Sequence, residues 1–203
     1  MLTRSTRSAR YVRLRRFPAA VLVIVVSVLI PEFGAWCQTS QPTEYQLKAA
    51  FLFNFAKFID WPSKAFSDAQ SPFTICVIGR DPFGSFLDEY LADKTIDNRP
   101  ISIKRFSSPG VPPQSRCQIA FISASERFHF RDVIASFDGE NTLLVGDADG
   151  FASSGGAIEF LLEENRVRFA INPDAADRAD LKVSSKLLSL AQIVHDDRDK
   201  GRN

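Results

Sequence analysis

The chain has 203 residues and a formal net charge of +1, from 25 lysines and arginines against 24 aspartates and glutamates. This length suits one well-buried domain and leaves little room for a second. Six arginines and one glutamate lie within residues 1–37, so the remainder is mildly acidic and has no basic cluster. That distribution argues against nucleic acid as a partner.

Residues 1–37 are predicted to be a secretory signal peptide. Their arginines form a basic n-region, and residues 19–30 form an apolar core that Pro31 closes. The core is short for a membrane anchor, because a transmembrane helix needs about 20 apolar residues. We therefore expect an exported protein rather than an anchored one.

Cleavage after Ala35 or Cys37 would leave one domain over residues 38–203. Two alternatives stay open at this point. Cys37 could be lipidated, although the residues before it fit that signal poorly, and Arg15-Arg16 could indicate twin-arginine export.

The first predicted helix occupies residues 44–62 and is rich in phenylalanine. Its apolar residues recur at three- and four-residue intervals, the period of a helix with one buried face. Thr43 can cap its start, and Pro62 ends it because the residue before proline is pushed out of the α region. We expect this aromatic face to pack on a sheet, although part of the excess could form a partner surface.

Two apolar runs without alternation, residues 73–79 and 117–123, predict strands that are covered on both faces. Predicted helices follow them at residues 81–92 and 125–137, and residues 100–106 alternate like a more exposed strand.

The last third of the chain predicts another strand, a hairpin and a helix. The strand occupies residues 141–146, and the hairpin pairs residues 157–162 with 167–171 across a polar turn. An amphipathic pattern predicts a final helix over residues 184–194.

Strands separated by helices predict an α/β fold with a mostly parallel sheet, flanked by helices on both faces and with an antiparallel hairpin at one edge. In doubly wound orders with a central first strand, the strands at 73–79 and 117–123 are neighbours. They carry Cys76 and Cys117, and neighbouring strands lie ~4.8 Å apart, close to the Cα separation of a disulfide. Export favours a bridge, and two buried thiols are the alternative.

A first candidate binding site lies at the carboxyl ends of these strands, where open α/β sheets hold ligands. Gly79, Asp81, Ser123 and Ser125 would flank that crevice, and a helix N-terminus there can receive an anion. Alternatively, Asp81 and Ser125 are only helix caps.

A second candidate site is the predicted hairpin. Arg166 and Arg168 punctuate its apolar residues, and an exposed edge strand can dock a partner. Alternatively, these arginines are ordinary surface charges.

The sequence contains little catalytic machinery. It has no nucleophile elbow, no Walker loop and no dinucleotide-binding glycine pattern, and its two histidines lie in a predicted helix and in the tail. The segment 147–150 lacks most ligands of a calcium loop, and Cys76 and Cys117 are too far apart in sequence for a metal-binding pair. We therefore expect no enzyme, no cofactor and no metal.

Several motifs follow one another in a specific order: residues 45–62, 75–79, 81–84, 117–123, 155–156, 165–172 and 181–188. This series resembles the YfiR-like family of periplasmic proteins and spans nearly all of the chain after residue 37.

The resemblance implies an α/β periplasmic repressor, often a dimer. Such proteins bind the periplasmic sensor domain of an inner-membrane diguanylate cyclase and lower cyclic-di-GMP signalling and biofilm growth. The resemblance also implies that Cys76 and Cys117 form the family's central bridged pair. A second cysteine pair, which some members have near residues 147–154, is absent. A periplasmic small-ligand sensor is the alternative function.

Overall fold

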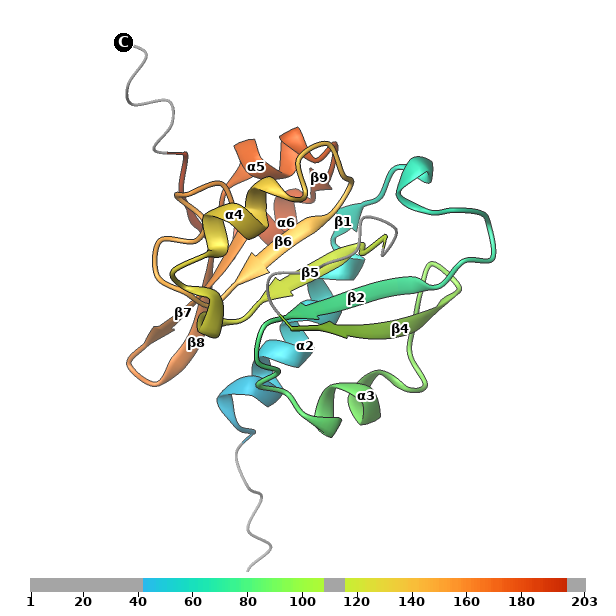
Figure 1. Cartoon of the computed structure of the whole chain (residues 1–203), viewed down its shortest axis with the longest axis horizontal. Coiled ribbons are helices and arrows are strands. Elements are labelled where there is room, and N and C mark those ends of the chain that lie inside the picture. Colours follow the sequence, from blue (N-terminus) through green and yellow to red (C-terminus); the bar gives the residue numbers. More distant parts are fainter. Residues whose placement is uncertain (1–41, 108–115, 197–203) are drawn as a thin grey trace, which may run out of the picture. The chain divides into compact units, whose positions relative to one another are not determined.

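The structure is a computed structural model that describes residues 42–107 and 116–196, and the predicted signal peptide lies outside these residues (Figure 1). Its α-helices are α2 (Glu44–Lys57), α3 (Ser85–Leu91), α4 (Phe130–Ala135), α5 (Pro173–Arg178) and α6 (Ser185–Leu188). Within the same described ranges, the 3-10 helices are η1 (Ser63–Ala65) and η3 (Ala124–Glu126). The strands are β1 (Ile59–Asp60), β2 (Phe73–Ile78), β3 (Thr95–Ile96), β4 (Arg99–Phe106), β5 (Ile119–Ile122), β6 (Leu143–Gly146), β7 (Ile158–Glu163), β8 (Arg166–Ile171), β9 (Lys182–Val183) and β10 (Gln192–Ile193).

The main sheet has the order β10-β8-β7-β6-β5-β2-β4-β3. The five central strands, β7, β6, β5, β2 and β4, run parallel to one another. On either side of them, β8 is antiparallel to β7 and β3 is antiparallel to β4. This arrangement confirms the predicted α/β fold with a mostly parallel sheet and an antiparallel hairpin. It also confirms that β2 and β5 are neighbours, with Cys76 opposite Ala120.

Helices cover both faces of the sheet, but unequally (Figure 1). Buried side chains of α2, α3, α5 and α6 share one apolar cluster with alternate strand residues such as Ile75 and Val77; we call this side the helix-rich face. The other alternate residues, including Cys76 and Ile78, form a smaller cluster with α4 and Phe151, which we call the disulfide face. The period-two alternation of each strand therefore divides the interior into two unequal cores.

The aromatic helix α2 begins where the sequence predicts and ends earlier. Thr43 and Gln46 form a reciprocal capping box at its start, and Phe58 caps its end. The prediction of a helix as far as Pro62 is wrong, because Ile59 and Asp60 leave it as β1 and pair with β9 in a separate two-stranded sheet. A pairing partner more than a hundred residues away thus overrides the local helical pattern.

Three other predicted helices are shorter than expected. The helix predicted from residue 81 begins at Ser85, and the one predicted over residues 125–137 divides into η3 and α4. The one predicted over residues 184–194 ends after α6, because the chain straightens into β10 and runs parallel to the end of β8. A backbone bond from Val194 N–H to the Ile171 carbonyl, 2.9 Å long, continues this pairing.

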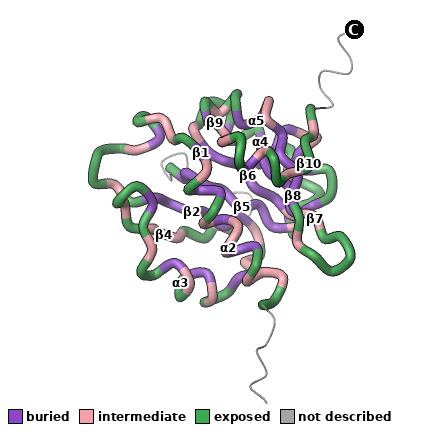
Figure 2. Tube along the Cα trace, turned by 180° about the vertical axis from the view of Figure 1, so that it is seen from behind, coloured by how far each residue is buried: buried purple, intermediate pink, exposed green. Residues whose placement is uncertain are grey.

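Burial follows the sheet closely: the central strands are buried throughout, while the turn joining β7 and β8 is exposed (Figure 2). Among the described residues, no helix is long and apolar enough to cross a membrane.

Candidate functional site

The carboxyl ends of β2 and β5 meet at the point where the winding of the sheet reverses, and the structure brings the predicted residues there together. Ser123 N–H donates to the Ile78 carbonyl over 3.0 Å, and Arg80 N–H donates to Ser125 Oγ over 2.9 Å. Ser123, rather than Ser125, caps the 3-10 helix η3 by accepting from Ser125 N–H. The two loops therefore form one hydrogen-bonded unit.

Gly79 is required by the close approach of these loops. Its φ of +89° lies in the left-handed region, and a Cβ at this position would lie 2.5 Å from both Glu126 Oε1 and Ser125 Oγ. The buried Glu126 carboxylate also accepts from Ser125 Oγ over 2.9 Å. Side chains of the protein itself thus occupy the space directly above Gly79, and an anion site at that point is not supported by this geometry.

Asp81 stabilises a turn and an ion-pair cluster rather than the first residue of a helix. Its Oδ1 accepts from Phe83 N–H over 2.8 Å, and its Oδ2 accepts from Arg105 Nε over 2.7 Å. The same guanidinium also pairs with Asp88 of α3, and this bond lowers the pKa of the Asp88 carboxyl. The Asp88 and Asp81 carboxylates in turn raise the pKa of Arg105. Arg105 therefore joins β4 to α3 and to the turn before it.

A buried charged cluster at the carboxyl end of β6 was missed by the sequence analysis. Lys48 of α2 lies 3.3 Å from Asp147 Oδ2, which also accepts from the Tyr45 hydroxyl over 3.0 Å. The Asp147 side chain is 1% exposed, and its Oδ1 has no hydrogen-bond partner among the described residues. Burial and the neighbouring Asp147 carboxylate raise the pKa of Tyr45. The cluster fixes the start of α2 to the strand end.

One sequence signal could have indicated part of this cluster. Lys48 precedes the fully buried Leu52 by four residues, so both belong to the buried face of α2. Lysine is almost never fully buried without a partner, so its position predicts a nearby acid. The sequence shows one such acid, Glu44, which lies four residues before Lys48 and 2.6 Å from its Nζ. It does not show Asp147, because that contact depends on how α2 lies over β6.

Two cavities adjoin these elements. One of about 350 Å³ lies at the carboxyl ends of β5 and β6 and is lined by Ala124, Arg127, Phe128, Phe130 and residues 147–149. The other, of about 340 Å³, lies between α4 and α5, with Phe137, Leu144 and Arg178 in its wall. Both volumes are at the lower end of the range for small-molecule pockets. Among the described residues, no group of three or more His, Cys, Asp or Glu could hold a metal ion.

Arg166 and Arg168 lie apart from this region, on β8, which β7 and β6 separate from β5. Both side chains are exposed, and Arg168 Nε lies 3.2 Å from Glu163 Oε2 across the hairpin. The predicted site residues therefore form two separate places, the strand-end loops and the hairpin.

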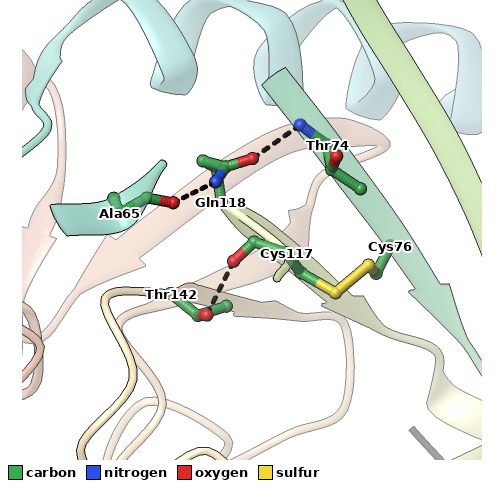
Figure 3. Close-up of a disulfide and its surroundings, with 6 residues drawn as sticks. All are labelled: Ala65, Thr74, Cys76, Cys117, Gln118 and Thr142. Atoms are coloured by element: carbon green, nitrogen blue, oxygen red, sulfur yellow. Dashed lines mark hydrogen bonds between the residues drawn. A yellow bond between two sulfur atoms is a disulfide. The ribbon is translucent and has the colours of Figure 1, made fainter. Parts of the chain in front are cut away.

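The Cys76–Cys117 disulfide joins β2 to the residue that precedes β5 by two positions, with a Cα–Cα distance of 5.7 Å (Figure 3). Its presence confirms the predicted bridge. Gln118, beside it, accepts from Thr74 N–H over 2.7 Å and donates to the Ala65 carbonyl, while Thr142 Oγ1 donates to the Cys117 carbonyl over 2.7 Å. The bridge is buried, and its polar neighbours are satisfied on both sides.

Comparison with known proteins gives one strong match. A family model described as YfiR/HmsC-like (DUF4154) matches residues 45–192, well over half of the chain. A search of curated proteins finds no match. Among solved structures, the ABC domain from Streptococcus pneumonia in complex with L-Trp is similar, with a TM-score of 0.49 and 12% sequence identity. That similarity covers 74% of this chain and 60% of the other, so the chain spans less than two thirds of that structure.

Proposed function

We propose, from the premise that this chain belongs to the YfiR/HmsC-like family, that it is a periplasmic regulatory protein that acts by binding a protein partner. Its partner is the periplasmic sensor domain of an inner-membrane diguanylate cyclase, which it represses, so that cyclic-di-GMP signalling falls. The observation that carries this proposal is the family match over residues 45–192, which takes in α2, the whole parallel sheet and the hairpin.

Two features of the chain support an exported protein. The basic and apolar pattern of residues 1–37 is typical of a signal peptide that is removed, leaving a single domain over residues 38–203. The buried Cys76–Cys117 bridge is the kind of cross-link that persists in an oxidising compartment. Intact mass of the protein from a periplasmic extract tests both features, since it reports the cleavage position and the loss of two hydrogens.

Repression without catalysis requires a preference for one state of the partner. A bound repressor shifts the cyclase toward the inactive conformation only by as much as its affinity for the two conformations differs. The proposal therefore predicts that the protein binds the sensor domain of an inactive cyclase variant more tightly than that of a constitutively active one.

The decisive experiment combines a deletion strain with co-purification. Deleting the gene is expected to raise cyclic-di-GMP, and the full chain, but not a version without residues 1–37, is expected to restore the lower level. Tagged protein is expected to co-purify a diguanylate cyclase from solubilised membranes. Unchanged cyclic-di-GMP in the deletion strain, together with no cyclase in the purified fraction, would refute the proposal.

A second candidate function is a periplasmic small-ligand sensor, and the cavity of about 350 Å³ beside Arg127 and Phe128 favours it. A ligand that binds only the folded state raises the melting temperature by mass action. If a periplasmic metabolite does so and the effect disappears on Arg127→Ala, the cavity binds that ligand. Loss of cyclase binding in the presence of the metabolite would make both functions parts of one mechanism.

A further inference from the structure

The outer side of β8 is only partly paired. Strand β7 pairs with all six residues of β8, from Arg166 to Ile171, on its inner side. On the outer side, β10 reaches only Ala170 and Ile171, and no other described strand pairs there. An unpaired length of strand is a template on which another strand can form.

The backbone of this open length faces outward at Val167. The Ile171 carbonyl accepts from Val194 N–H at the outer side, and residues of a strand alternate in the direction of their backbone groups. Val167, four residues earlier, therefore directs both its N–H and its C=O to the same side. These are the groups that an added strand would use.

The side chains that flank the open edge differ between its two faces. Arg166 and Arg168 project on one face and are exposed. Arg168 contacts Glu163 through its Nε, and the other N–H donors of its guanidinium can bind a further acceptor. On the other face Val167 is half-buried beside Leu162, which is 55% exposed. The turn beyond these residues projects from the body of the sheet and is exposed (Figure 2).

The geometry points to this edge as the place where the partner docks, and the inference rests on the proposed function. We infer that the cyclase's periplasmic domain adds an extended segment to β8, bonded to the backbone of Val167. That segment carries acidic residues at alternate positions facing Arg166 and Arg168, and an apolar residue on the opposite side facing Val167. Main-chain bonds supply affinity in such strand addition, and the alternating side chains supply specificity.

A second copy of this chain fits the edge less well. Antiparallel self-pairing centred on Val167 would place Arg166 of one copy opposite Arg168 of the other, and like charges in directly opposed positions are destabilising. At the opposite edge of the sheet, β3 pairs only with Arg99 and Pro100, so no described strand pairs with the rest of β4 on its outer side. That edge is a poorer candidate for an acidic segment, because Arg105 of β4 already pairs with two carboxylates, Asp81 and Asp88.

Two substitutions test the edge in the mature protein with purified cyclase periplasmic domain. Val167→Pro removes an N–H that no described strand uses and adds a ring there, a position where strands tolerate proline. Arg168→Glu reverses a charge, and Arg131→Glu, at an exposed arginine of α4, is the matched control. We expect Val167→Pro and Arg168→Glu each to weaken binding by at least about tenfold and Arg131→Glu to change it less than about twofold.

Hydrogen exchange of the unmodified protein gives a test that does not depend on how a variant folds. We expect the amides of Val167 and Phe169 to exchange more slowly in the complex than in the free protein, while the outer amides of β4 are unchanged. Unchanged exchange at the hairpin in a complex that does form would overturn the inference.

The possible outcomes separate the two proposals. If the wild-type protein does not bind the cyclase domain, the proposed function fails. If it binds and both variants bind equally well, the function stands and the docking edge is wrong. If light scattering shows a wild-type dimer that Val167→Pro dissociates, the edge belongs to a second copy, which also overturns the inference.

Discussion

The helix-rich face of the sheet is covered by α2, α3, α5 and α6, whereas the disulfide face is covered by α4 and the loop at residues 147–157. On the first face Phe55 packs against Phe160 and Phe169, with ring centroids 5.7 and 5.1 Å apart. On the second face the apolar cluster is smaller: Phe151 packs edge-on against Phe130, with ring centroids 5.6 Å apart, and the Cys76–Cys117 bridge lies in the same cluster. Side-chain burial therefore stabilises both faces, but the disulfide face buries fewer side chains and adds a covalent constraint.

The largest expected effect is on the helix-rich face. Phe55 is fully buried, so Phe55→Ala removes a ring from the centre of the α2–sheet contact and is expected to cost about 3–5 kcal/mol. Urea unfolding followed by far-UV circular dichroism measures it. Phe128→Ala, at a ring that is 77% exposed, is the matched control and should stay within about 0.5 kcal/mol. Equal effects of the two substitutions would remove the basis of the comparison.

The next effect is on the disulfide face. The bridge joins residues separated by 41 positions, so removing it in Cys76→Ala/Cys117→Ala is expected to lower the free energy of unfolding by about 3–4 kcal/mol. Urea unfolding with and without dithiothreitol measures the loss. Reductant should move the wild-type midpoint toward that of the variant and leave the variant itself unchanged. A wild-type midpoint equal to that of the variant without reductant would show that this face does not depend on the bridge.

A smaller effect is expected where Phe151 meets the sheet. A Cβ on Gly156 would lie 2.1 Å from Phe151 Cε1, so Gly156→Ala must displace the ring and is expected to cost about 1–3 kcal/mol. Phe151→Leu in the same chain should relieve the clash, so thermal unfolding of the two single variants and the double variant is expected to be non-additive. Strict additivity would show that the ring does not rest on Gly156.

Sequence patterns were sufficient to predict the longer strands of the sheet, which have a recognisable apolar composition of their own. The unalternating runs in β2 and β5 identified buried strands, the hairpin was placed correctly, and strand order then brought Cys76 and Cys117 together. The two-residue strands β1, β9 and β10 were missed, because each is defined by a distant partner and not by its own composition. A local periodicity cannot report such pairings. The two-residue strand β3 was missed as well, although it pairs locally with β4 across the turn at Asp97 and Asn98.

The candidate site residues show the same contrast between positions that local patterns predict and contacts that depend on packing. Asp81 and Ser123 were correctly placed at the strand ends, because the carboxyl ends of parallel strands share one edge. The filling of that crevice by Glu126, and the contact of Lys48 with Asp147, depend on how separate segments pack. The hairpin pattern alone placed Arg166 and Arg168 on the second strand of the hairpin, but the open length of β8 follows from the short reach of β10.

The smallest expected effect is electrostatic, at the rim of the helix-rich face. The bond to Arg105 holds the pKa of Asp88 below its ordinary value of 3.8, so the ion pair adds stability above that pH and loses it as the pH falls through the lower, folded-state pKa. The Asp88 side chain is 50% exposed and solvent screens the pair, so Asp88→Asn is expected to cost no more than about 1 kcal/mol. The difference between wild type and variant should be present above the ordinary pKa of 3.8 and shrink progressively as the pH falls below it. Glu89→Gln, at an exposed neighbour on the same helix, is the control in these urea titrations. A difference that persists at the lowest pH would mean that Asp88 stabilises α3 by packing. Packing alone, with no contribution from an ion pair, would then account for the stability of this rim of the helix-rich face.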